Sequence, residues 1–237
     1  MSVTTMPPAP SPCFPPVEFV VDGVRRFGSG SGSTHTTTPQ AYARVRLDSV
    51  LGAAIADAYV AAPVRDERAY AAYAAFCRET LQQYHLLVGR PEFGGLGVAV
   101  RIVDEDPYAD VESMVEDVRH RRLKIFASAA SGNPHPYLSD GENDMFRAVH
   151  DVFGHAGSGR GFDRHGEEAA WLKHSAMYSR LAARALTTET RGQNCAQIFR
   201  YGAGRFAEQK AALLPRLFSD PRLVRVVGKE VRPVARC

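Results

Sequence analysis

The segment 146–168 reads FRAVHDVFGHAGSGRGFDRHGEE, and it decides how the centre of the chain is expected to fold. It places His150 and His155 five residues apart, with Gly154 just before the second histidine. Residues five apart on a regular α-helix point about 140° away from each other, so the middle of such a helix cannot direct both imidazoles at one ion. Gly154 allows the last turn to unwind and lets His155 swing back. The segment therefore predicts a helix that ends from Gly154 onward and carries half of a metal site.

The spacing of the two histidines argues against the helix of the zinc proteases. That helix needs histidines four apart and a glutamate after the first. In this chain the spacing is five, and Asp151 follows His150. The pair alone also has a plain explanation, in which one buried histidine is held by a carboxylate and the other lies on the surface. A third ligand is needed to decide between the two interpretations.

The third ligand is sought among three glutamates. Two histidines and a carboxylate on one face of a metal ion leave the opposite positions open for oxygen or substrate. The candidates are Glu167, Glu168 and Glu189. Glu189 lies in ALTTETRGQN, among small and neutral residues, where a buried carboxylate is costly unless it is paired or metal-bound. A salt bridge to Arg191 or another core arginine is the alternative. We predict Glu189 as the third ligand, with Glu167 and Glu168 supporting the pocket.

These residues carry a resemblance to a known family. The sequence resembles the pterin-dependent aromatic amino acid hydroxylases, which have a His-Glu-x-x-Gly-His helix, a short loop to a phenylalanine and a helix with a glutamate. A later helix of that family carries the carboxylate that completes an iron site. The matching elements in this chain, over about residues 143–194, are HDVFGH (150–155), Phe162, GEE (166–168) and TTETRG (187–192). The block from DPY (106–108) to TETRGQN is also similar to uncharacterised proteins of phages and actinobacteria.

The resemblance implies a mainly α fold with a small β-sheet (α+β), built around a helical core like that of the aromatic amino acid hydroxylases. It also implies that His150, His155 and Glu189 bind Fe(II) on one face, with open positions for water, O₂ and substrate. The cosubstrate of that family is a tetrahydropterin. Asp151 stands where the family has its glutamate and would orient a ligand histidine or touch the cosubstrate. Glu168 would have the same kind of supporting role.

The same stretch offers candidates for substrate binding. Arg147 lies three residues before His150, about 60° around the helix, and is placed to bind a substrate carboxylate bidentately, with Arg191 as its rival. The other candidates are aromatic, and core packing is the favoured alternative for each of them. They are Phe153 and Trp171 for an apolar wall, and Tyr178 for a hydrogen bond.

The rest of the chain predicts helices beside a small sheet. The proline-rich start and a Gly/Ser/Thr stretch predict a mobile N-terminal segment over 1–44, in which 17–27 is compatible with a short hairpin. Residues 45–237 then form a single globular, metal-binding catalytic domain. Alternating apolar residues predict strands at 97–103, 123–128 and 223–231. Apolar residues at helical spacing predict helices at 48–62, 66–89, 109–122, 139–153, 163–179, 180–194 and 202–215.

The composition fits one globular domain in a reducing setting. The chain has 237 residues, of which 45% are hydrophobic, and a formal net charge of +3, which is too small to indicate nucleic-acid binding. The four cysteines show no CxxC spacing and indicate neither a disulfide framework nor a cysteine zinc site. There is no secretory signal and no apolar run near the ~20 residues of a membrane span, so we expect a cytoplasmic protein. The oligomeric state stays open, a homo-oligomer included.

Three functions remain in competition. The first is a mononuclear non-haem Fe(II) oxygenase, a monooxygenase or hydroxylase that acts with O₂ on a small molecule such as an amino acid or a related metabolite. The second is an HD-type metal-dependent phosphohydrolase. Its ligands would be His150 and Asp151, with His120 or His135 upstream and Asp163 or another acid downstream. The third is a non-enzymatic binding protein whose basic C-terminal segment contacts an acidic partner. We expect the first, because the second leaves His155 and TTETRGQN without a task.

Overall fold

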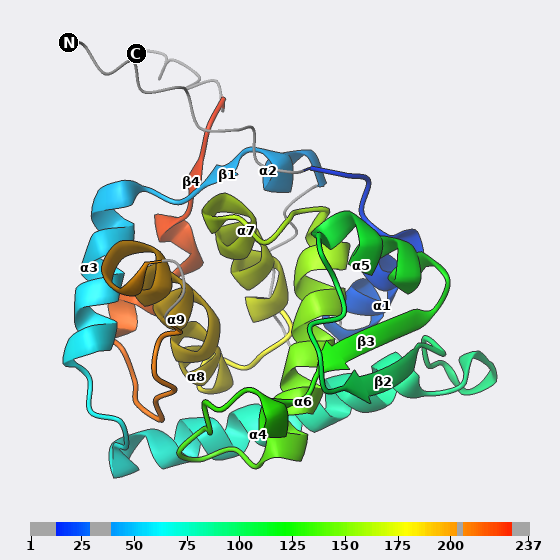
Figure 1. Ribbon diagram of the computed structural model, residues 1–237. Coiled ribbons are helices and arrows are strands. Elements are labelled where there is room, and N and C mark those ends of the chain that lie inside the picture. The colour runs from blue at the N-terminus through cyan, green and yellow to red at the C-terminus, as the bar shows by residue number, and fades with distance from the viewer. Residues whose placement is uncertain (1–12, 29–38, 203–205, 229–237) are drawn as a thin grey trace.

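The computed structural model describes residues 13–28, 39–202 and 206–228. Helices make up most of this part of the chain, and the strands form two small two-stranded sheets (Figure 1). The predicted fold class, mainly α with a small β content, is confirmed. No helix within these ranges is both long enough and apolar enough to cross a membrane.

Helix α4 (Tyr70–Val88) runs along one side of the molecule and supports the helices that carry the candidate site (Figure 1). It packs against α6 (Asp140–Val149) and α8 (Ala182–Thr187). The rings of Phe76 on α4 and Phe146 on α6 meet edge to face, with centroids 4.9 Å apart. Aromatic pairs of this kind add to the free energy of apolar burial, so α6 is held firmly on α4.

The main helices begin at the polar residues expected to cap them. The side chain of Asp48 accepts hydrogen bonds from the backbone at the start of α3 (Ser49–Ala61). Asp163 does the same for α7 (Arg164–Ser175), and Ser139 opens α6 with a capping box. Such caps satisfy backbone N–H groups that have no partner inside the helix. The predicted starts of these three helices are therefore confirmed.

A strand–helix–strand unit forms one edge of the molecule. Strands β2 (Ala99–Val103) and β3 (Arg122–Phe126) are parallel and are joined by α5 (Val111–Arg119). The apolar side chains of α5 are all buried: Val111, Met114, Val115 and Val118. The second sheet pairs β1 (Val45–Arg46) with β4 (Arg225–Val226) in antiparallel fashion. Of the strand predicted at 223–231, residues 225–226 are thus confirmed, Leu223 belongs to a 3₁₀ turn, and 229–231 lie outside the described ranges.

Short elements complete the chain. The remaining short α-helices are α2 (Pro39–Ala43) and α9 (Gln193–Ala196). Within the described ranges, three segments are π-helical: His150–Ala156, Thr188–Gly192 and Gln197–Tyr201. The 3₁₀ turns are Glu67–Ala69, Pro91–Phe93, Ser128–Ala130, Arg216–Ser219 and Pro221–Leu223.

Part of the N-terminal segment predicted to be mobile belongs to the core. Residues 18–28 form helix α1 (Glu18–Gly28) and not the expected hairpin. Val17 and Val20 are buried, and the backbone N–H of Val17 donates to the carbonyl of Ala156 at 3.0 Å. The helix was missed although Val20, Val24 and Phe27 recur at helical spacing, because the stretch is short and lies between a proline-rich segment and a Gly/Ser/Thr-rich segment. Residues 1–12 and 29–38 of the predicted segment lie outside the described ranges.

The stretch 202–215, predicted to be a helix, contains no helix in its described residues, 202 and 206–215. Its carbonyl groups are taken by side chains of other elements. The hydroxyl of Tyr73 donates to Lys210 O at 2.8 Å, and that of Thr188 donates to Ala212 O at 2.8 Å. These contacts replace the hydrogen bonds that a helix would form, and they outweigh the helical preference of the sequence.

Candidate metal centre

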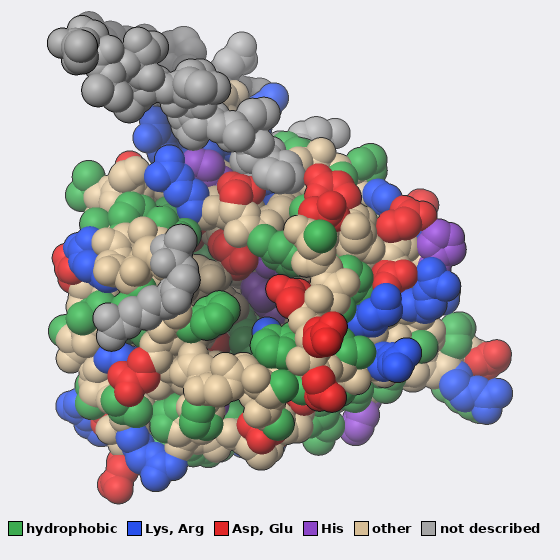
Figure 2. Space-filling model, in the orientation of Figure 1, with side chains coloured by type: hydrophobic (Ala, Val, Ile, Leu, Met, Phe, Trp, Pro, Cys, Tyr) green, Lys and Arg blue, Asp and Glu red, His purple; other side chains and the backbone are tan. Residues whose placement is uncertain are grey.

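A cavity of about 410 Å³ opens on one face of the molecule, within the size range of small-molecule sites. Figure 2 shows it as a hollow with a histidine surface at its bottom and acidic groups nearby. Part of the wall is aromatic, and Phe162, the phenylalanine of the resemblance, lies edge to face with His155 at 4.9 Å between centroids. Side-chain amides are also frequent in the lining: Asn133, Asn143, Gln193, Asn194, Gln197 and Gln209.

The two histidines of the central helix share one face because the helix changes its winding between them. Helix α6 runs directly into the π-helical segment His150–Ala156. In a π-helix the backbone hydrogen bond closes on the fifth residue, so residues five apart lie nearly above one another. The ring centroids of His150 and His155 are 5.1 Å apart. The helix therefore continues through Gly154 and does not end there, which corrects the expected unwinding.

Gly154 serves the site by leaving space. A Cβ atom at this position would lie 3.1 Å from Nδ1 of His150 and 3.2 Å from Cβ of Ala170. The φ angle of Gly154 is not positive, so its backbone conformation is open to other residues as well. The position requires glycine for its small size. The His150 ring packs over the bare backbone, and any side chain here would displace it.

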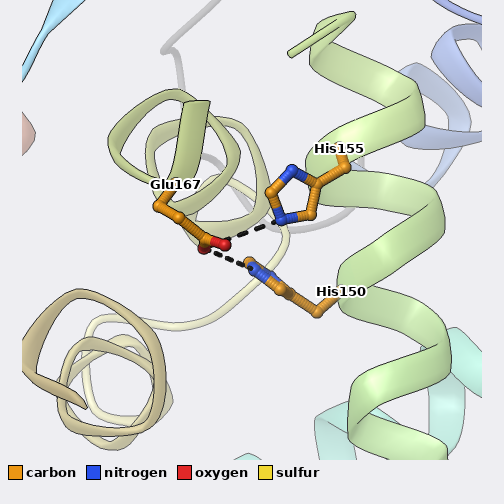
Figure 3. A group of neighbouring side chains, drawn as sticks. All are labelled: His150, His155 and Glu167. Atoms are coloured by element: carbon orange, nitrogen blue, oxygen red, sulfur yellow. Dashed lines mark ion pairs between the residues drawn. The ribbon is translucent and has the colours of Figure 1, made fainter. Parts of the chain in front are cut away.

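Glu167 is the carboxylate that the structure brings to the histidines (Figure 3). It lies in the first turn of α7, facing the π-helical segment. Its Oε2 is 3.6 Å from Nε2 of His155 and 3.9 Å from Nε2 of His150. Within the described ranges, this is the one group of three histidine, cysteine or acidic side chains whose ligand atoms all lie within 4.8 Å of one another.

The arrangement of the three donor atoms fits a divalent metal ion. Both nitrogen–oxygen distances exceed the length of a hydrogen bond. They are near the roughly 3.0–3.4 Å expected between two ligands that each lie about 2.1 Å from one ion. Nε2 of His150 is buried and has no hydrogen-bond partner among the described residues. A buried nitrogen without a partner is costly, and a metal ion would satisfy it.

The electrostatics of the group also favour a cation. Burial alone would raise the pKa of the Glu167 carboxyl, but the interactions with His155 and His150 lower it to about 2. Burial opposes the charge on His155, yet the Glu167 carboxylate raises the pKa of this imidazole above its ordinary value. Both shifts favour the charged forms, so the group attracts positive charge. A divalent ion would take the place of the proton on His155.

Three further contacts hold the donor atoms in place. Nδ1 of His155 lies 3.1 Å from the carbonyl of Arg160. Because a carbonyl only accepts, Nδ1 carries the proton and Nε2 presents its lone pair to the site. Nδ2 of Asn194, on α9, donates to Oε2 of Glu167 at 2.6 Å. Nδ1 of His150 lies 3.1 Å from Nδ1 of His174, a buried histidine on α7.

Glu189, predicted as the third ligand, lies apart from this group. Its Oε1 is held by the hydroxyl of Tyr73 and by Nε2 of His135, which is 3.1 Å away. It nevertheless lines the same cavity. The carboxylate beside the histidines thus changes from Glu189 to Glu167, which was a second choice on the sequence. The reason is that α7 turns its first polar residues toward the π-helical segment.

Arg147 and Asp151 both line the cavity, as their predicted roles require. Nη1 of Arg147 donates to the carbonyl of Phe126 at 3.0 Å, and the guanidinium lies 5.7 Å from the centre of the Phe126 ring. Burial raises the pKa of Asp151, although the nearby histidines and Arg147 oppose this. The two side chains give the cavity a cation and an acid beside the candidate metal group.

The other predicted site residues lie in the core and not in the cavity wall. Arg191 forms a buried ion pair with Glu168, in which its Nε donates at 2.7 Å, and its guanidinium lies 4.2 Å from the centre of the Trp171 ring. Phe153 is fully buried, and the hydroxyl of Tyr178 bonds to Thr80. The three aromatic residues are packed in the core, which was the favoured alternative for each of them. Glu168 and Arg191, which were predicted to lie at the pocket, are also buried in the core.

The structure does not assemble the ligands of the alternative phosphohydrolase. His120 is exposed and bonds to the backbone of its own helix. His135 bonds to Glu189, and Asp163 caps α7. None of these three joins His150 in a group with ligand spacing within the described ranges.

Two of the residues that hold the ligands were missed. The sequence alone favours a surface position for His174 over a role as a reserve ligand, but its side chain is buried. It follows Glu167 by seven residues, which is the spacing that returns to the same face of a helix. Asn194 carries no such signal, because its contact with Glu167 joins two helices that are distant in sequence.

No protein-family model, curated protein sequence or solved structure matches this chain. The functional inference therefore rests on the residues and geometry described above.

Proposed function

We infer that the protein is a mononuclear non-haem Fe(II)-dependent oxygenase that acts on a small molecule, such as an amino acid or a related metabolite. The metal ligands in this proposal are His150, His155 and Glu167. One observation carries it: two buried histidines and a glutamate direct their donor atoms to one point in the wall of a small-molecule cavity. Three ligands from one side leave the cavity side open, which is typical of iron oxygenases.

Iron(II) in such a site supplies the binding and activation of O₂. The chain's own residues supply position and shielding. Asn194 orients the Glu167 carboxylate, and the Arg160 carbonyl fixes the His155 ring. Phe162 covers His155 with an aromatic edge and limits the access of water from that side.

The charged residues of the cavity support an amino acid as the substrate class. Arg147 uses one nitrogen for the Phe126 carbonyl, and the rest of its guanidinium fork offers donors for a substrate carboxylate. Glu189 lines the same cavity and offers an acceptor for an ammonium group. A monooxygenase also needs two electrons from a reductant. A tetrahydropterin is the reductant that the resemblance implies, and the aromatic side chains of the cavity would provide stacking surfaces for its ring.

The test is metal loading of the full chain purified without a histidine tag. The metal-free protein is titrated with Fe(II) under anaerobic conditions, and nitric oxide is added as an O₂ analogue for electron paramagnetic resonance. We expect one iron per chain and the signal of an iron nitrosyl, both lost in His155→Ala. His120→Ala is the matched control, because this histidine is exposed and outside the cavity.

Oxygen uptake is then measured with pooled amino acids and a tetrahydropterin. Failure to bind iron would refute the proposal, as would iron that takes up no nitric oxide. Hydrolysis of phosphoesters with manganese or magnesium would instead favour the phosphohydrolase.

A further inference from the structure

A chain of buried hydrogen bonds lies behind His150, on the side away from the cavity. Nδ1 of His150 is 3.1 Å from Nδ1 of His174. Nε2 of His174 is 2.7 Å from Oε1 of Gln83, which lies on α4. Nε2 of Gln83 donates to the backbone carbonyl of Met177 at 3.3 Å. The side chains of His174 and Gln83 are both fully buried.

The direction of every hydrogen bond in this chain follows from its last member. The Met177 carbonyl can only accept, so the amide nitrogen of Gln83 must face it. The opposite orientation of the amide would place two carbonyl oxygens against each other. Oε1 of Gln83 therefore faces His174 and receives the proton of Nε2.

The same reasoning fixes both imidazoles. With its proton on Nε2, the neutral ring of His174 offers a lone pair at Nδ1. Nδ1 of His150 must then donate to it, because two lone pairs 3.1 Å apart would repel each other. The remaining nitrogen of His150, Nε2, consequently carries a lone pair. It is the buried atom that faces Glu167 and has no hydrogen-bond partner among the described residues.

We propose that Gln83 and His174 are positioning residues that set the tautomer of His150, so that its Nε2 is ready to bind a metal. The metal part of this inference rests on the proposed function, whereas the tautomer does not. Metal-binding histidines usually donate their second nitrogen to a carboxylate, a carbonyl or water. Here a neutral imidazole is the acceptor, and a glutamine on another helix orients it. The tautomer is thus set without adding a negative charge to the site.

A purely structural role of Gln83 is the alternative, and two substitutions separate the two explanations. Gln83→Glu keeps an oxygen that can accept from Nε2 of His174, whether the carboxyl is ionised or protonated. Gln83→Met keeps the approximate size and the apolar contacts but removes the acceptor. If only packing matters, the methionine variant is the milder one, because it buries no additional polar group. If the tautomer matters, the glutamate variant is the milder one.

The first measurement is long-range ¹H–¹⁵N NMR of histidine-labelled, metal-free full-length protein. It reports directly which nitrogen of each ring carries the proton. We expect the proton on Nδ1 of His150 and on Nε2 of His174 in the wild type and in Gln83→Glu. In Gln83→Met we expect a mixture of tautomers at His150. A wild-type His150 with its proton on Nε2 would overturn the proposal, and this result needs no variant to fold.

The second measurement is the affinity for Co(II), followed by its visible absorption. We expect Gln83→Met to weaken binding by about 10- to 100-fold, the usual effect of losing a partner of a ligand histidine. Gln83→Glu should stay closer to the wild type. The reverse order of the two variants would overturn the positioning role. A wild type that shows the expected tautomers but binds no metal would support tautomer control and refute the proposed function.

Discussion

Replacing Glu167 with glutamine tests the metal centre most directly, because it changes one charged atom and almost no volume. The carboxylate lies 3.6 Å and 3.9 Å from the two histidine nitrogens. In the metal-free protein, these neighbours lower its pKa from the ordinary 4.5 to about 2. That shift corresponds to about 3 kcal/mol of interaction that favours the ionised form. Because the folded pKa is depressed, this stabilisation is present above pH 4.5 and is lost as the pH falls toward 2.

Glu167→Gln should therefore lower the stability of the metal-free protein at neutral pH by up to about 3 kcal/mol. Its effect on metal binding should be larger than that of losing an outer partner, which typically costs about 10- to 100-fold in affinity. Chemical denaturation gives the first quantity. Titration with Co(II) or Fe(II), with metal analysis after dialysis, gives the second.

Glu189→Gln is the matched control, since this glutamate lines the same cavity but is held by Tyr73 and His135. It should keep one metal per chain. The opposite outcome, in which Glu189→Gln loses the metal and Glu167→Gln keeps it, would refute Glu167 as the third metal ligand. It would support the ligand set implied by the resemblance to the hydroxylases.

Three further predictions concern the surroundings of the site. Gly154→Ala places a Cβ 3.1 Å from His150 Nδ1, so it should weaken Co(II) binding and destabilise the fold by about 1–3 kcal/mol; unchanged affinity would contradict the packing argument. Metal binding should displace the proton of His155, whose pKa is raised, so that affinity rises with pH and the calorimetric heat depends on the ionisation enthalpy of the buffer. A heat that is the same in all buffers would contradict this. Glu168→Gln leaves the buried Arg191 without its ion-pair partner and should lower the free energy of unfolding by about 3–5 kcal/mol in a denaturation experiment. Loss of metal without loss of stability would instead indicate that Glu168 supports the metal site.

The elements that could be predicted from the sequence are those with local signals. Helices α3, α5 and α6 begin at polar capping residues and carry apolar residues at helical spacing, and both signals lie within a few residues of each other. The stretch 206–215 has a comparable helical pattern but contains no helix. Its carbonyl groups are bound by side chains such as Tyr73 and Thr188, which lie far away in sequence. No local pattern contains that information.

The candidate site also combines features that local sequence patterns predict with features that depend on contacts distant in sequence. The sequence predicted that His150 and His155 act together and that a regular helix would separate them. The π-helical segment that unites them packs against α7 and α1, and its Ala156 carbonyl accepts a hydrogen bond from Val17; none of these contacts is local in sequence. The choice of Glu167 over its neighbours depends on the rotation of α7, which follows from tertiary contacts. Residue type and spacing reduced the candidates for the third ligand to three glutamates, but they could not determine which of the three lies beside the histidines.

The way the ligands are held has a consequence for metal binding. Each donor is fixed by a contact that needs no metal: His155 by the Arg160 carbonyl, Glu167 by Asn194, and His150 by its hydrogen bond to a buried histidine. The surrounding helices pack on a large apolar core of their own. In small zinc domains, by contrast, the free energy of metal binding is spent on folding. Here it is available for coordination, so removal of the metal should leave the far-ultraviolet circular dichroism spectrum unchanged. Unfolding on chelation would show that the donor atoms depend on the ion for their arrangement.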